Sequence, residues 1–396
     1  MTKTHSRGDS YTVVGIAYAE MLGIGLFASM LGIAWPSVRA SFGLPLDALG
    51  LLLLASTASH LLASFATGRL VSALGVGRFL LLSSLVMMAG AAAFSRATSW
   101  GWLIVASMVA GAGMGAMDGA LNIYFALNFS TRLVNWLHVN FGLGAMLGPV
   151  FVTTLLARAL PWQSGYLVVS GVFAALAVCF LITRRRWQLP TDTMEEARPS
   201  APLRQTLRLP LAWAGIFLFF VYTGVESVAG QWSYTLLTEG RGVLPAYAGI
   251  WLSLFWAGLG VGRFLFGLIG DRWSATRLLL GCMAIALLGS LLIAIPTWPG
   301  LNFGGLALMG LALAPIFPTL IAMTPRWVGH THAANSIGFQ VSAASLGYAV
   351  LPAIAGILAA RISLEAIGPF LAANTLLMLW FYRRQLTHPL VQSPAA

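Results

Sequence analysis

Residues 111–149 of this chain read GAGMGAMDGALNIYFALNFSTRLVNWLHVNFGLGAMLGP. Two apolar segments, each long enough to cross a membrane, meet here at a short polar turn at residues 128–132. The polar side chains inside the two segments are Asp118, Asn122, Asn135, His138 and Asn140. Because polar groups are costly in hydrocarbon, they normally face a bundle interior or a wet cavity. We therefore expect this hairpin to form part of a functional site.

The composition of the whole chain agrees with a membrane protein. Of its 396 residues, 58% are hydrophobic and 8% are charged, whereas soluble domains have about 25% charged residues. The apolar runs are continuous and do not alternate with polar residues as in an outer-membrane barrel. The sequence therefore predicts an all-α polytopic membrane protein.

Twelve apolar runs approach the roughly 20 residues that a membrane span needs. They lie at residues 11–36, 46–67, 78–97, 101–128, 133–157, 166–184, 210–236, 246–268, 277–296, 300–323, 333–359 and 366–382. Pro318 and Pro352 predict kinks in spans ten and eleven. We expect two six-helix bundles, at residues 1–187 and 210–396, joined by a cytoplasmic linker at residues 188–209.

The net charge of +11 comes mostly from arginines in short loops between the apolar runs. The segments that would face inward with both termini inside hold most of these arginines, as the positive-inside rule expects. The short polar N-terminus lacks the features of a cleavable signal peptide, so the first span is expected to be retained. We predict a multi-pass monomer in the inner (cytoplasmic) membrane, with both termini cytoplasmic, the lipid bilayer as partner and no nucleic acid.

The two halves of the chain repeat each other. Residues 68–78 read GRLVSALGVGR and residues 267–277 read GLIGDRWSATR, with the same glycine-to-arginine spacing. Asn135 and Asn140 in span five match Asn335 and Gln340 in span eleven at one shared offset. Duplication of this kind is typical of transporters, whose substrate site lies between the repeats near the bilayer midplane.

Twelve spans in two halves, a central linker and Gly-x-x-x-Asp-Arg motifs after spans two and eight resemble the major facilitator superfamily. The copy at residues 267–272 is complete, whereas Ser72 replaces the aspartate in the first copy. The resemblance implies transport by alternating access between the two bundles, with these loops gating the movement. The implied gating residues are Gly68, Arg78, Gly267, Asp271 and Arg272.

A finer resemblance lies in the opening hairpin. Residues 118–122 (DGALN), 135–138 (NWLH) and 141–145 (FGLGA) are similar to the fucose and glucose symporter branch. That branch places an essential glutamate where Asp118 stands. Its fucose symporters also carry an acidic residue late in span one, and residues 32–36 (GIAWP) have none.

Three carboxylates lie well inside the predicted spans: Glu20, Asp118 and Glu226. A desolvated carboxyl group disfavours its charged form, so it can take up a proton and release it when water enters. We expect these groups to couple transport to protons. Each could instead hydrogen-bond to a neighbouring helix and hold the bundle together. His138 can approach Asp118 across the hairpin, and because histidine titrates near neutral pH the two suit a proton relay.

Candidate substrate-binding groups lie on spans four, five, seven and eleven. Gln231 and Trp232 place an amide beside an aromatic ring, a combination that suits a sugar or another polar ring. The alternative is that Trp232 faces lipid and Gln231 contacts a helix. The full set is Asn122, Asn135, Asn140, Tyr222, Gln231, Trp232 and Gln340. In this interpretation Glu226, Gln231 and Gln340 line the side of the substrate cavity opposite the hairpin.

The sequence therefore favours a secondary transporter that imports a small polar solute, such as a sugar, together with H⁺; Na⁺ stays an alternative. The hairpin's Gly148-Pro149 pair resembles the span-five motif of drug–proton antiporters, so efflux of a drug or metabolite is a second hypothesis. A non-transporting receptor or an embedded enzyme is the remote third, because the chain carries no Walker loop or common hydrolase motif. No cofactor or metal is expected.

Overall fold

A computed structural model describes residues 7–129, 131–188, 201–269 and 274–386, which divide into two compact units. Of these described residues, the first unit comprises 7–44, 51–129 and 131–188, and the second comprises 45–50, 201–269 and 274–386. Within the described residues, twelve helical segments are long and apolar enough to cross a membrane. The predicted number of spans and the all-helical class are confirmed.

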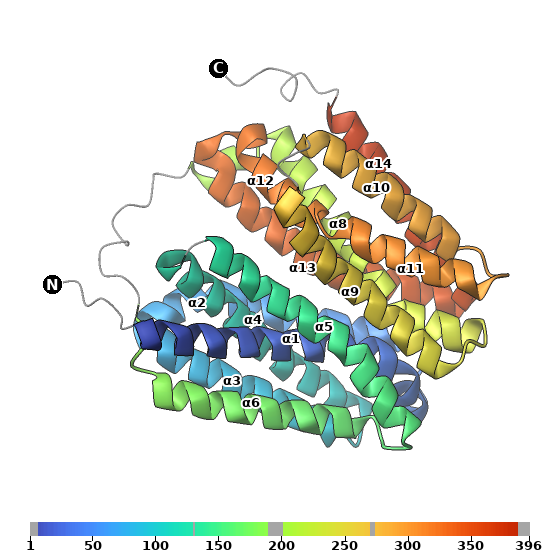
Figure 1. Ribbon diagram of the computed structural model, residues 1–396, viewed down its shortest axis with the longest axis horizontal. Helices are drawn as coiled ribbons and strands as arrows, with labels where there is room; N and C mark the ends of the chain where they lie inside the picture. The colour runs from blue at the N-terminus through green and yellow to red at the C-terminus, as the bar shows by residue number, and fades with distance from the viewer. Residues whose placement is uncertain (1–6, 130, 189–200, 270–273, 387–396) are drawn as a thin grey trace. The chain divides into compact units, whose positions relative to one another are not determined.

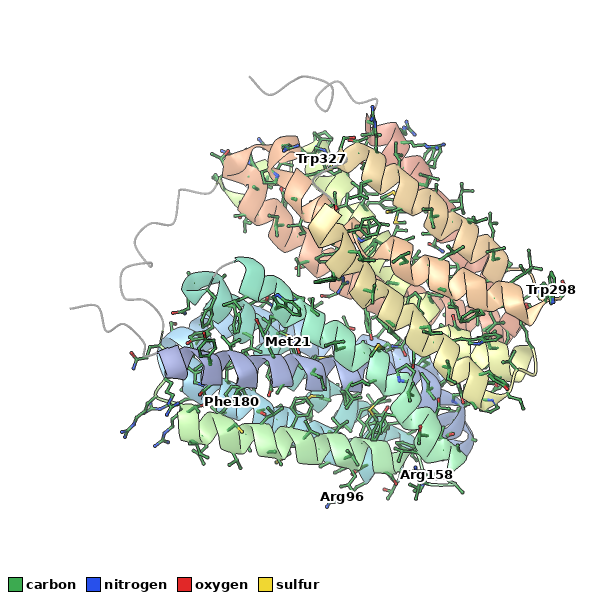
Figure 2. All side chains as sticks on the ribbon, viewed as in Figure 1. Met21, Arg96, Arg158, Phe180, Trp298 and Trp327 are labelled. Atoms are coloured by element: carbon green, nitrogen blue, oxygen red, sulfur yellow. The ribbon has the colours of Figure 1, made fainter. Side chains whose placement is uncertain are left out.

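The first unit is a bundle of six long helices. Adjacent helices are joined by short turns, and α2 passes into α3 through Gly75 alone, whose φ of +78° suits glycine. Figure 2 shows Arg96 and Arg158, which follow α3 and α5, at the same end of this unit. The helices are α1 (Arg7–Phe42), α2 (Ala48–Leu74), α3 (Val76–Ser95), α4 (Trp100–Asn128), α5 (Thr131–Ala157) and α6 (Gln163–Thr183).

The second unit repeats this plan with two irregular spans. A π-helical turn extends α8, and span ten is broken at Ala314–Pro315, a few residues before the predicted kink at Pro318. The elements are α7 (Leu203–Thr206), α8 (Pro210–Thr235), η1 (Leu236–Gly240), α9 (Pro245–Ile269), α10 (Ala275–Ile293), α11 (Pro299–Leu313), α12 (Ile316–Val328), α13 (His330–Arg361), η3 (Leu364–Ala366) and α14 (Ile367–Leu386).

Helix pairing shows that the two units are structural repeats (Figure 1). In the first unit α1 packs along α5, and α3 packs along α4 and α6; in the second, α8 packs along α13, and α10 along α11 and α14. A Cβ at Gly111 would lie 2.2 Å from the Ser56 carbonyl oxygen, and a Cβ at Gly310 would lie 2.2 Å from that of Phe255. Both contacts need glycine, because any side chain there would overlap the neighbouring backbone.

Span eleven runs through Pro352 without a break, as the single helix α13. A proline cannot donate to the carbonyl one turn earlier, here that of Tyr348. The Ser227 hydroxyl of α8 donates to this carbonyl at 2.7 Å. The neighbouring helix thus satisfies the group that the proline leaves open.

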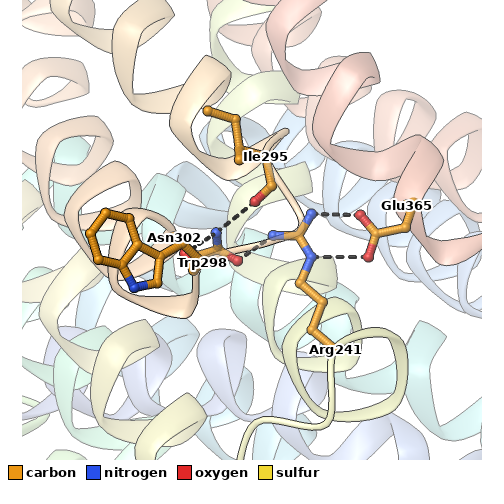
Figure 3. Close-up of polar contacts among 5 residues, drawn as sticks. All are labelled: Arg241, Ile295, Trp298, Asn302 and Glu365. Atoms are coloured by element: carbon orange, nitrogen blue, oxygen red, sulfur yellow. Dashed lines mark hydrogen bonds and ion pairs between the residues drawn. The ribbon is translucent and has the colours of Figure 1, made fainter.

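One end of the second unit is held together by Arg241, whose side chain is 3% exposed (Figure 3). Its Nε and one terminal nitrogen donate to the two carboxylate oxygens of Glu365 at 3.0 and 2.6 Å. Its other terminal nitrogen donates to the Asn302 side-chain oxygen, and Asn302 donates to the carbonyl oxygens of Ile295 and Trp298. Arg241 therefore links the segment after η1 to η3 and to the start of α11.

Candidate functional site

The first group of candidate residues surrounds Asp118 on α4. Asn122, one turn later, donates its amide to the Asp118 carboxylate at 2.9 Å and to the Asp118 carbonyl oxygen at 2.9 Å. Helix α2 passes close by, since a Cβ at Gly115 would lie 2.2 Å from the His60 carbonyl oxygen. Asp118 and Asn122 therefore form one polar unit on the face of α4 that meets α2.

His60 is a site residue that the sequence alone did not single out. Its side chain interacts electrostatically with Asp118, and its buried Nδ1 has no hydrogen-bond partner among the described residues. A histidine in an apolar span resembles an ordinary packed residue until the neighbouring helix is known. The close approach of α2 to α4 at Gly115 is what brings it to the carboxylate.

The next candidates are the predicted polar residues of α5. His138 is exposed on α5, and its relay with Asp118 stays a prediction. Asn140 donates its amide to the Trp136 carbonyl one turn earlier, at 2.8 Å. Asn135 lies in α5, but its side chain is outside the described part of the structure.

Glu20 occupies a separate place in the first unit. It is fully buried on α1, and neither carboxyl oxygen has a hydrogen-bond partner among the described residues. Ser84 of α3 lies beside it and donates to the carbonyl of Phe173 on α6. Glu20 therefore faces α3 and α6, whereas Asp118 faces α2.

The second group of candidate residues is centred on Glu226 of α8. The Tyr222 hydroxyl donates to Glu226 Oε2 at 2.6 Å, and a terminal nitrogen of Arg263 on α9 lies 3.9 Å from the same oxygen. The side chains of Arg263 and Glu226 are 24% and 13% exposed. A guanidinium at this distance balances the charge of the carboxylate.

Arg263 is the second residue that the sequence reasoning missed. The carboxylates inside the predicted spans were expected to be functional, yet a guanidinium inside an apolar segment is just as costly. Arg263 interrupts the apolar run at residues 246–268 and was visible there. Its pairing with Glu226 depends on the packing of α8 beside α9, which the sequence does not show.

The remaining candidates of the second unit are mostly fixed by protein partners. Gln231 donates to the Tyr348 hydroxyl at 3.1 Å, and its buried side-chain oxygen has no partner among the described residues. Trp232 is fully buried and donates to the Pro352 carbonyl at 2.9 Å. Gln340 accepts from Thr324 at 3.0 Å and packs against Gly215. Trp232 is therefore fixed by α13, and Gln231 retains a side-chain oxygen that can accept a hydrogen bond.

The predicted gating residues are only partly described. Gly68 is exposed on α2, Arg78 is exposed on α3, and Gly267 lies in α9. Asp271 and Arg272 lie outside the described residues. The gating role of all five stays a prediction.

These features define a polytopic helical membrane protein built from two repeated bundles, each with an ionisable group inside its spans. A family model for the Major Facilitator Superfamily matches residues 21–243 and 233–396. The chain belongs to this superfamily, as the sequence motifs indicated. It is therefore a secondary transporter and not an enzyme.

Curated relatives extend this assignment. The chain is 22% identical over 356 residues to the glucose/mannose transporter GlcP of Bacillus subtilis (strain 168), covering 86% of each chain. It is 27% identical over 287 residues to an uncharacterised transporter of the same superfamily from Yersinia pestis, covering 69% of this chain and 72% of that protein.

Solved structures share the fold. The nucleoside transporter NupG matches with a TM-score of 0.79 at 11% identity, covering 95% of this chain and all (100%) of that one. The Escherichia coli fucose:proton symporter FucP matches with a TM-score of 0.63 at 15% identity, covering 94% of this chain and 98% of that one. A bacterial homologue of the human lysosomal transporter Spinster matches with a TM-score of 0.77 at 13% identity, covering 99% and 100%. At these identities the likeness concerns the fold alone.

Proposed function

We propose that this transporter imports a small polar solute, such as a sugar, together with protons. The observation that carries the proposal is the Asp118–Asn122 unit, a carboxyl group inside a membrane-spanning helix with an amide beside it. Carboxylates at such depth serve proton relays and substrate pathways. The sugar is suggested by two similar proteins, a glucose/mannose transporter and a fucose:proton symporter.

The partners of the carboxylates suggest a division of roles. Arg263 balances Glu226, so protonation of Glu226 would leave a guanidinium uncompensated inside the bundle. Asp118 has Asn122 and His60 as polar neighbours, and no guanidinium is paired with it in the described part of the structure, so a proton on Asp118 leaves no such charge behind. We therefore assign the transported proton to Asp118, and solute contact or positioning to Glu226, Tyr222 and Gln231.

Uptake into proteoliposomes tests this assignment. Glucose and mannose come first, and a thermal-shift screen of other polar solutes follows, since a ligand of the folded state raises its melting temperature. Acid outside and neutral pH inside should drive accumulation in the wild type. Asp118→Asn should abolish that accumulation while still allowing exchange of labelled for unlabelled solute at equal pH.

Two results would overturn the assignment. Uptake by the wild type that does not depend on the pH gradient would show that transport is not coupled to protons. Gradient-driven accumulation that persists in Asp118→Asn would show that another group carries the transported proton. Efflux driven by an inward proton gradient would instead favour the antiporter hypothesis.

We also propose that both termini face the cytoplasm, as the arginine distribution predicts. Reporter fusions at either end of the full chain test this orientation. A cytoplasm-active reporter should work at both ends, and a periplasm-active one at neither. Activity of the periplasmic reporter at either end would contradict the proposed orientation.

A further inference from the structure

A basic cavity lies at one end of the first unit, away from Glu20 and Asp118, and it includes Arg78, one of the predicted gating residues. It has a volume of about 360 Å³ and is lined by Arg78 at the start of α3 and by Arg184, Arg185 and Gln188 after the end of α6. All four side chains are exposed. By the arginine distribution, this is the cytoplasmic end of the unit.

The positive charge of this cavity is not balanced within the described part of the unit. None of its three guanidinium groups has a hydrogen-bond or ion-pair partner among the described residues. The carboxylates whose side chains are described in this unit, Glu20 and Asp118, lie inside helices α1 and α4. Three guanidiniums around one cavity therefore form a site suited to an anion.

The cavity is also built on a fixed backbone. Gly77 allows the end of α6 to approach α3, since a Cβ there would lie 2.1 Å from the Arg184 carbonyl oxygen. Trp187, between the arginines and Gln188, is 3% exposed and donates to Thr183 at 3.1 Å. Its ring packs against Tyr124 and Phe180. Trp187 thus anchors the turn that carries two of the three arginines.

Apolar side chains continue from the cavity along both helices. Leu82 and Leu85 follow Arg78 on one face of α3, and they are 48% and 38% exposed. On α6, Leu181 and Ile182 precede the arginine pair and are 48% and 76% exposed. A ligand with a phosphate group and long acyl chains matches a surface that is basic at the cavity and apolar along the two helices.

We propose that this cavity binds the phosphate headgroup of an anionic membrane lipid, with its acyl chains lying along α3 and α6. Guanidinium groups form paired hydrogen bonds with phosphate oxygens, which gives both affinity and orientation. The adjoining apolar surface favours a lipid over free phosphate, because free phosphate gains nothing from it.

Native mass spectrometry of the full-length protein in detergent tests the proposal. Phosphatidylglycerol and phosphatidylcholine with identical acyl chains are titrated in parallel, and inorganic phosphate forms a third arm. The test variant is Arg184→Gln/Arg185→Gln. The matched control, Arg96→Gln/Arg158→Gln, removes two exposed arginines at the other end of the same unit.

The wild type and the control should bind phosphatidylglycerol about tenfold or more tightly than the test variant, with phosphatidylcholine binding the same in all three. Melting temperatures equal to that of the wild type would show that the variants are folded. Equal phosphatidylglycerol affinity in the wild type and the test variant would overturn the site. Inorganic phosphate that binds the wild type as tightly as phosphatidylglycerol would overturn the assignment to a lipid.

Discussion

Two ionisable groups inside the spans differ in what surrounds them. Glu226 has a guanidinium and a phenol as partners, whereas Glu20 is fully buried with no hydrogen-bond partner among the described residues. An unpaired charge at such a position would be very costly, so Glu20 is expected to be neutral when the protein is folded. Glu226, by contrast, belongs to an arrangement in which charges compensate one another.

The Glu226–Arg263 pair predicts non-additive effects of substitution. Glu226→Gln or Arg263→Gln alone leaves one charge uncompensated inside the bundle, whereas the double variant leaves none. The double variant should therefore be less destabilised than the sum of the singles, by about 0.5–3 kcal/mol. Thermal or denaturant unfolding in detergent measures this difference.

The same cycle with Arg277→Gln in place of Arg263→Gln serves as the control. Arg277 is exposed at the start of α10, so its effect should add to that of Glu226→Gln. Additivity in the Glu226–Arg263 cycle as well would show that the two groups do not interact.

At the scale of the helices, close packing through glycine holds equivalent pairs together in the two units. The approach of α4 to α2 at Gly111 recurs between α11 and α9 at Gly310. A Cβ added at either glycine would lie 2.2 Å from a backbone carbonyl oxygen of the facing helix. Gly111→Ala and Gly310→Ala should each destabilise the protein by about 1–3 kcal/mol, because the helices must move apart. Thermal unfolding in detergent measures the loss.

Glycines without close neighbours provide matched controls for this prediction. Gly171 on α6 and Gly281 on α10 have nothing within 4 Å of an added Cβ. Alanine at either position should leave the melting temperature unchanged or raise it slightly, since alanine favours helix. Equal losses of stability at all four positions would show that close helix packing is not the cause.

The Arg241 contacts make a second prediction at this scale. Arg241→Gln leaves Asn302 and Glu365 without their shared donor, so the ends of η1, α11 and η3 lose a common anchor. We expect a loss of about 1–3 kcal/mol in the free energy of unfolding. Arg361→Gln, an exposed arginine at the end of α13, is the control and should have little effect. Equal stability of Arg241→Gln and the wild type would contradict the anchoring role.

At the scale of the whole chain, the sequence was sufficient for the architecture because hydropathy and duplication are long-range patterns. Twelve apolar runs predicted twelve spans, and the repeat at residues 68–78 and 267–277 predicted that the two halves are duplicated. The equivalent helix pairs of the two units agree with this duplication. These properties depend on length, composition and spacing, which a sequence displays directly.

The composition of the site was less predictable, because it depends on which helices touch. Asp118 with Asn122 follows from helical spacing alone, and so does Tyr222 with Glu226. The additions of His60 and Arg263 required the contacts of α2 with α4 and of α8 with α9. Trp232 was expected to bind solute or to face lipid, but it is buried against α13. The helical pattern of the sequence does not show which helix a side chain packs against.

The central claim, that solute and proton move together through a carboxyl at Asp118, is tested most directly by solute-driven proton movement. Proteoliposomes with a trapped pH indicator start at equal pH on both sides, and the solute is added outside. In the wild type the lumen should become acidic as solute enters, and Asp118→Asn should show no pH change. A lumen that stays at its starting pH in the wild type, or becomes equally acidic in Asp118→Asn, would contradict the claim.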